Sequence, residues 1–81
     1  MSKRIFITGG AKGIGKAIVQ AFSKENNQVA FCDIDVDAGK ILSESTHSSF
    51  FKADAGNKVE LESALQKLFA DWGDIDILIN N

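Results

Sequence analysis

The sequence has one cysteine, one histidine, no tyrosine and no proline, and its formal net charge is only −2. Because Cys32 is alone, it cannot form a disulfide within the chain, and a secreted, disulfide-stabilised fold is not expected. No apolar run approaches the ~18 residues of a membrane-spanning helix, and no signal peptide is recognisable. The sequence therefore predicts a cytoplasmic protein that has no membrane segment.

Metal and nucleic-acid ligands are also sparse. His47 lies among serines and a threonine, without a cluster of further ligands at metal-binding spacing, so no metal site is expected. The slightly acidic balance gives no electrostatic reason to expect nucleic acid or an anionic membrane as a partner.

What the sequence does contain is a regular alternation of apolar segments and helical patterns. Its 81 residues correspond to one small domain or a piece of one, since domains most often have about 100–150 residues. Four predicted strands cover residues 4–8, 29–33, 49–54 and 75–80. Strands that alternate with helices in this way form parallel sheets with right-handed crossovers.

Two helical patterns separate the first three strands. The second of them begins at Asp35 or Asp37, is weakly amphipathic, and is expected to give way to a polar loop over residues 43–48. The first pattern ends at Asn26-Asn27, and the residues of its predicted apolar face are Ile14, Ala17, Ile18, Ala21 and Phe22.

The third helical pattern is the clearest. Asn57 and Glu60 resemble a capping box at its start, and Gly73 stands where a C-terminal glycine belongs. The residues of its predicted apolar, core-facing stripe are Leu61, Leu65, Leu68, Phe69 and Trp72.

This order predicts an α/β fold, the N-terminal half of a doubly wound, Rossmann-like parallel sheet with strand order 3-2-1-4. Residues 1–81 would then be the dinucleotide-binding part of a single Rossmann domain, truncated after the fourth strand.

The segment Thr8-Gly9-Gly10-Ala11-Lys12-Gly13-Ile14-Gly15 follows the first strand and opens the first helix. Glycines permit a tight turn and let the backbone approach a pyrophosphate closely. Asp33 lies 18 residues beyond Gly15, near the ~20 expected for a carboxylate that binds the adenosine ribose. The arrangement favours a dinucleotide site over a ligand-free turn in a non-catalytic interaction module.

A second alternative is the phosphate loop of a nucleoside triphosphatase. Residues 10–16 fit G-x-x-x-x-G-K, but Ala17 occupies the position of the Ser or Thr whose hydroxyl binds Mg²⁺. Lys16 then reads more simply as a solvent-facing helix residue.

With these motifs in place, the chain resembles the short-chain dehydrogenase/reductase family over its whole length. The T-G-x-x-x-G-I-G motif is complete from Thr8 to Gly15, and Asp33 matches the acidic residue after the second strand. The family's Asp-Val pair is matched at Asp54 and departs at Ala55, and Asn80-Asn81 begins its Asn-Asn-Ala-Gly motif. The cofactor-binding residues that the resemblance implies are Gly9, Lys12, Gly13, Ile14, Gly15, Asp33, Asp54, Ala55 and Asn81.

The resemblance implies an NAD(P)-dependent oxidoreductase that transfers a hydride to or from an alcohol or carbonyl carbon. The family's catalytic Ser, Tyr and Lys have no counterpart here, since the chain has no tyrosine, so no catalytic residue is assigned. The 81 residues are therefore expected to be an inactive cofactor-binding fragment. Asp33 favours NAD over NADP, although NADP-preferring members often carry a basic residue at the position of Lys12.

The last apolar segment predicts self-association. In strand order 3-2-1-4 it is an edge, with Ile75, Ile77 and Ile79 expected on one face and Leu78 on the other. An apolar edge strand offers unpaired backbone groups to a second copy. We therefore expect a homo-oligomer.

Overall fold

The two central strands are apolar on both faces, as parallel strands buried between two layers are. The computed structural model, which describes residues 2–81, places β1 (Arg4–Thr8) beside β2 (Gln28–Asp33). Alternate side chains of these strands enter two separate buried clusters. Ile5, Ile7, Val29 and Phe31 belong to one cluster, and Phe6, Ala30 and Cys32 to the other.

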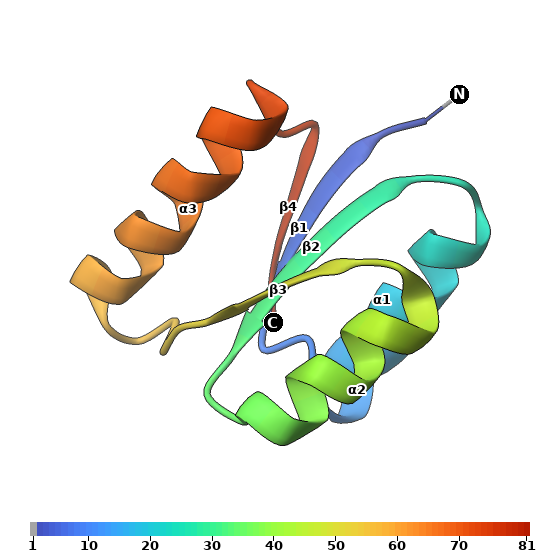
Figure 1. Ribbon diagram of the computed structural model, residues 1–81, viewed down its shortest axis with the longest axis horizontal. Coiled ribbons are helices and arrows are strands. Elements are labelled where there is room, and N and C mark those ends of the chain that lie inside the picture. The colour runs from blue at the N-terminus through green and yellow to red at the C-terminus, as the bar shows by residue number, and fades with distance from the viewer. Residues whose placement is uncertain (1) are drawn as a thin grey trace.

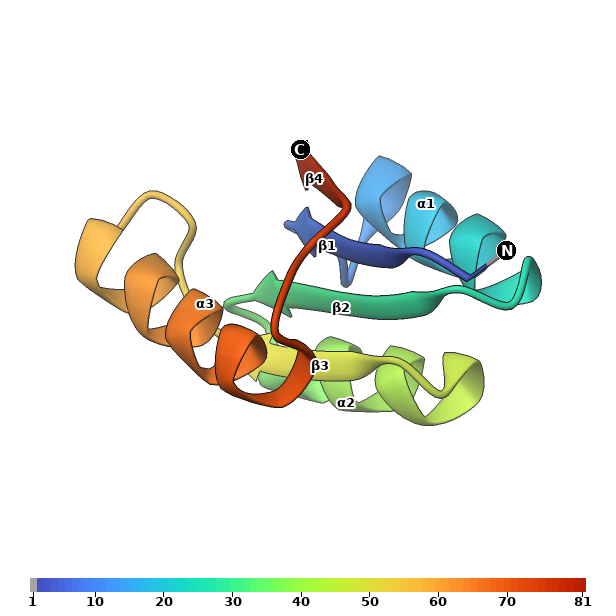
Figure 2. The same ribbon diagram turned by 90° about the horizontal axis from the view of Figure 1, so that it is seen from above.

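The sheet has the order β3-β2-β1-β4, and every neighbouring pair is parallel (Figure 2). The outer strands are β3 (Ser49–Lys52) and β4 (Ile77–Asn80). The α/β class and the strand order predicted from the sequence are therefore confirmed.

Helices cover both faces of the sheet (Figure 1). On one face lie α1 (Gly13–Lys24) and α2 (Val36–Thr46), which contribute Val19 and Leu42 to the first cluster. On the other lies α3 (Lys58–Trp72), whose Ala64 and Leu68 pack into the second cluster. Within residues 2–81, none of these helices is both long and apolar enough to cross a membrane.

The predicted polar loop after α2 is wrong over most of its length, because the helix continues to Thr46. In this last turn the Thr46 hydroxyl donates to the Leu42 carbonyl at 2.7 Å. The helix ends at His47, whose φ of 57° lies in the left-handed region. The polar segment is thus helical up to Thr46, with its hydroxyl groups bonded to the helix's own backbone rather than directing a loop.

The predicted apolar face of α1 is also wrong in part. Ile14 is 75% exposed, and the fully buried residues of this helix are Gly15 and Val19. Of the five predicted face residues, Ile18 and Phe22 do pack against the first cluster. The helix turns Gly15 inward because a residue without a side chain lets the helix approach the Gly9 carbonyl and the Asn81 side chain.

At the start of α3, the predicted capping box is half formed. The Asn57 side chain accepts from the Val59 and Glu60 N–H groups, as a cap should. Glu60, however, accepts from the Asp54 N–H rather than returning to Asn57. The C-terminal glycine is confirmed, since Gly73 has a φ of 82°.

Two further expectations fail at the outer elements. Ile75 precedes β4 and packs into the α3-side cluster, whereas Ile77 and Ile79 pack on the opposite face. In α3, Phe69 is 45% exposed rather than core. The edge position of β4 itself is confirmed, and it leaves Leu78 59% exposed.

Candidate functional site

The carboxyl ends of the strands meet at one edge of the sheet. Thr8 at the end of β1 is in register with Cys32 on one side and Asn80 on the other. Ligands bind at this edge in open α/β sheets. An open pocket of about 180 Å³ lies there, lined by Gly9, Asp33, Ile34, Ala53, Asp54, Ala55 and Asn81. Five of the nine predicted cofactor residues therefore share one pocket.

The glycine loop is packed tightly against the end of β4. Gly9 has a φ of 64°, which a residue with a side chain rarely adopts. The Asn81 amide donates from Nδ2 to the Gly9 carbonyl at 3.1 Å. A Cβ atom on Gly15 would collide with that carbonyl oxygen and lie 2.7 Å from Asn81 Nδ2. The sequence motif thus reflects a close approach of loop, helix and strand.

The N-terminus of α1 differs from those of the other two helices. Asp35 caps α2 and Asn57 caps α3, each through a side-chain oxygen. The α1 cap residue, Lys12, makes no such bond, and the first turn contains no acidic residue. The N–H groups of a first helical turn lack helical partners and carry partial positive charge. The chain therefore presents an uncapped helix N-terminus, formed by Gly13, Ile14 and Gly15, at the end of the glycine loop.

Asp33 connects the glycine loop to the loop between β2 and α2. Its Oδ2 accepts from the Ala11 N–H and its Oδ1 from the Asp35 N–H, both at 3.1 Å. A carboxylate has about four lone-pair positions, so two acceptor positions remain. The side chain is held at the pocket wall by backbone groups from two loops and can still accept further hydrogen bonds.

Asp54 and Ala55 lie at the far side of the pocket. Asp54 Oδ1 accepts from the Gly56 N–H at 2.8 Å, and its backbone carbonyl accepts from the Asn57 N–H at 2.9 Å. These bonds fix the turn that leads from β3 into α3, and both residues are exposed. The structure thus gives Asp54 a turn-forming role in addition to its place at the pocket wall.

Sequence reasoning missed Thr8 as a structural part of the site. Its buried hydroxyl donates to Asn80 Oδ1 and accepts from the Asn81 N–H, both at 3.0 Å. It therefore places Asn81 beneath the glycine loop. The signal was present, since Thr8 opens the glycine motif. Ile34, which lines the pocket and is 66% exposed, carried no such signal.

A family model described as short chain dehydrogenase matches residues 3–81. The chain belongs to the short-chain dehydrogenase family. It is 34% identical over 80 residues to the mouse L-fucose dehydrogenase, covering 98% of this chain and 29% of that protein. A short-chain dehydrogenase/reductase mutant from Serratia marcescens superposes with a TM-score of 0.91 at 30% identity, covering 98% of this chain and 35% of that one.

The chain is also similar to a solved complex with a dinucleotide, NADP. The RhlG/NADP active-site complex of Pseudomonas aeruginosa matches with a TM-score of 0.86 at 27% identity, over 100% of this chain and 35% of that chain. The chain thus spans about a third of the length of the proteins that it matches.

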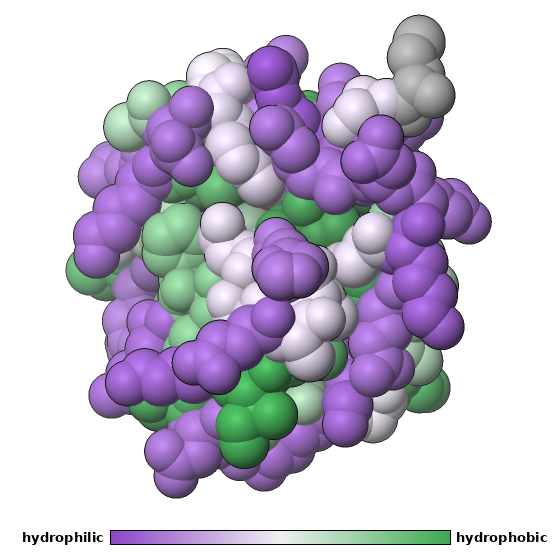
Figure 3. Space-filling view, turned by 45° about the vertical axis from the view of Figure 1, so that its right-hand side comes forward, coloured by the Kyte–Doolittle hydropathy of each residue, from purple (hydrophilic) through white to green (hydrophobic). Residues whose placement is uncertain are grey.

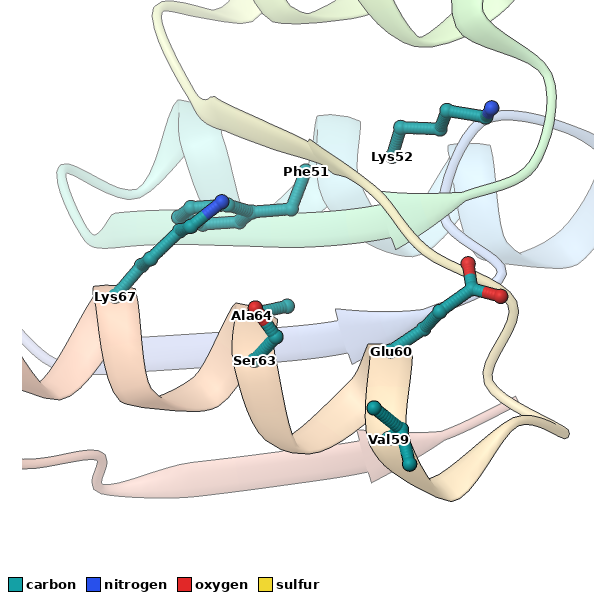
Figure 4. Close-up of a pocket in the computed structure, with 7 residues that line it drawn as sticks. All are labelled: Phe51, Lys52, Val59, Glu60, Ser63, Ala64 and Lys67. Carbon is teal, nitrogen blue, oxygen red and sulfur yellow. The ribbon is translucent and has the colours of Figure 1, made fainter.

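Other hollows of the short-chain dehydrogenase fold lie away from this edge. One of them, a pocket of about 290 Å³ between β3 and α3, is lined by none of the predicted site residues (Figure 4). Lys16 lines a third hollow, between α1 and α2, together with Gln20 and Ile41. Its position there does not support the triphosphatase alternative, in which it would reach the phosphates.

Proposed function

We propose that these residues form the dinucleotide-binding part of an NAD(P)-dependent oxidoreductase, within a single Rossmann domain. The observation that carries the proposal is the uncapped N-terminus of α1, which opens at the carboxyl edge of the sheet beside the Asp33 carboxylate. Family membership supports the reaction class, a hydride transfer between NAD(P) and an alcohol or carbonyl substrate.

In this proposal the pyrophosphate lies over the first turn of α1. The N–H groups of Gly13, Ile14 and Gly15 donate to it, and the helix dipole stabilises its charge. Because Gly9 and Gly15 have no side chains, the backbone of the loop and the first helical turn can come close to the pyrophosphate. Asn81 supports the loop through its bond to the Gly9 carbonyl.

The adenosine lies between Asp33 and Asp54. The free acceptor positions of Asp33 take the ribose hydroxyl groups, and Asp54 and Ala55 border the adenine. A 2′-phosphate beside Asp33 would bring two negative charges together, so we propose NAD as the preferred cofactor. Lys12, on the glycine loop, is the residue whose charge opposes this preference.

The catalytic acid/base is not assigned to these residues. Hydride transfer to a carbonyl needs a proton donor near the reacting oxygen, and the tyrosine that the family uses is absent from the 81 residues. We therefore expect the 81-residue chain to show no dehydrogenase activity by itself.

Thermal shift measurements with NAD⁺, NADP⁺ and Mg-ATP in parallel test the proposed cofactor. A ligand at 100 times its Kd stabilises the native state by about 2.7 kcal/mol, so binding raises the melting temperature by several degrees. We expect the largest rise with NAD⁺. A rise with Mg-ATP alone would favour a triphosphatase, and no rise with any nucleotide would favour an interaction module.

We also propose that the 81-residue chain self-associates through β4 or α3. The edge strand exposes Leu78, and the neighbouring helix face exposes Phe69 and Val59. Apolar patches interrupt the hydrophilic surface on the face shown in Figure 3. Analytical ultracentrifugation at tens of micromolar is expected to give a dimer. A compact, folded monomer would contradict this proposal.

A further inference from the structure

The lysine of the glycine loop does not point freely into solvent. Lys12 Nζ lies 2.7 Å from Asp35 Oδ2, and the two side chains are 68% and 31% exposed. The ion pair raises the pKa of Lys12 and lowers the pKa of Asp35, so both groups are charged at neutral pH. Asp33 adds a smaller effect of the same sign on Lys12.

Asp35 is itself fixed on both sides. Its Oδ1 caps α2 by accepting from the Ala38 N–H at 3.0 Å, which leaves Oδ2 for the ammonium group. Its own N–H donates to Asp33, the residue at the proposed ribose position. The carboxylate that holds Lys12 is therefore anchored to a helix N-terminus and directly linked to the site.

We propose that Asp35 is a specificity-determining residue that holds Lys12 in an ion pair and so prevents it from compensating the charge of a 2′-phosphate. This inference rests on the proposed dinucleotide site and adds to it a residue that does not itself contact the ribose. Lys12 directly follows Ala11, whose N–H donates to the Asp33 carboxylate, so the cation lies on the same loop as a group that binds Asp33. Without Asp35, its ammonium group would be available to NADP(H).

Asp35→Asn isolates the charge. Asparagine is as good a helix cap as aspartate, so α2 keeps its cap while Lys12 loses its partner. Fluorescence titration of the intact protein with NADH and NADPH gives both Kd values without requiring catalysis. Exposed ion pairs contribute about 0.2–1 kcal/mol, and we expect the Kd for NADPH to fall by about fivefold at the upper end of that range. The Kd for NADH is expected to change less than twofold.

Asp37→Asn is the matched control, because it removes the same charge two residues away, in the first turn of α2, without removing the partner of Lys12. It is expected to change the NADPH affinity less than twofold. Lys12→Ala completes a double-mutant cycle. It should weaken NADPH binding at least threefold more in the D35N background than in the wild type.

The outcomes separate the two proposals. An equal gain in NADPH affinity from D35N and D37N would overturn the role of Asp35, and so would additive effects of D35N and K12A on that affinity. Neither result would contradict the proposed dinucleotide site. An unchanged NADPH affinity in D35N, with NADH still bound by the wild type, would likewise overturn the role of Asp35 without contradicting that site. If the wild type bound neither dinucleotide, the proposed function would fail, and the inference with it.

Discussion

Gly15→Val is expected to weaken dinucleotide binding by tenfold or more, a loss of at least ~1.4 kcal/mol. A Cβ atom at this position would collide with the Gly9 carbonyl oxygen and crowd Asn81 Nδ2. Valine must therefore push the first turn of α1 away from the glycine loop. Overpacking of this kind costs about 1–3 kcal/mol in stability, so the melting temperature should fall as well. Titration with NAD⁺ and thermal denaturation measure the two effects.

Lys16→Ala is the control for this substitution. Lys16 follows Gly15 directly, but its side chain lines the hollow between α1 and α2 and makes no contact in the proposed phosphate site. Its removal is expected to change NAD⁺ affinity less than twofold. The opposite pattern, with a mild effect of valine and lost binding in the lysine variant, would support a triphosphatase-type loop instead.

Asp33→Asn is expected to reduce the preference for NAD⁺ over NADP⁺ by tenfold or more. Two unit charges ~4 Å apart repel by about 4 kcal/mol at an effective dielectric constant near 20, before screening by salt. Asparagine removes that repulsion but keeps one acceptor for the two N–H groups that Asp33 now binds. The free energy of unfolding of the variant should therefore fall only by the contribution of about one hydrogen bond, roughly 0.5–1.5 kcal/mol.

The ratio of the Kd values for NAD⁺ and NADP⁺ measures this effect. Asp71→Asn, which removes the same charge from the exposed end of α3, is the matched control and should leave the ratio unchanged. A wild-type protein that binds NADP⁺ more tightly than NAD⁺ would show that the carboxylate does not decide the choice.

The fold was predictable because its signals are local. The strand Arg4–Thr8 is centred on the short apolar run Ile5–Ile7, and Gly73 marks a helix end through a positive φ that residues with a side chain rarely adopt. The alternation of strands and helices gives parallel strands, and the strand order follows from the Rossmann-like pattern that the glycine motif and Asp33 indicate. The local sequence pattern did not predict which side of α1 is buried. Its buried side depends on Gly15 meeting the loop and on Val19 meeting the sheet, and Ile14, an apolar residue at regular spacing, is exposed.

The residues of the candidate site were predicted from motifs, but the contacts between them were not. Gly9, Asp33 and Asn81 were each expected from a motif, and the pocket that unites them comes from strands meeting at one edge. The ion pair of Lys12 with Asp35 joins two loops across the chain, and no periodicity signals such a contact. The same holds for the bond from Asn81 to Gly9.

A structure of the intact protein with bound NAD⁺ tests the central claim most directly. We predict that the pyrophosphate lies over the N–H groups of Gly13 and Ile14. A ribose hydroxyl oxygen should lie within hydrogen-bonding distance of the Asp33 carboxylate, about 2.5–3.0 Å. A nucleotide in the hollow between β3 and α3, or one whose ribose faces away from Asp33, would contradict the account.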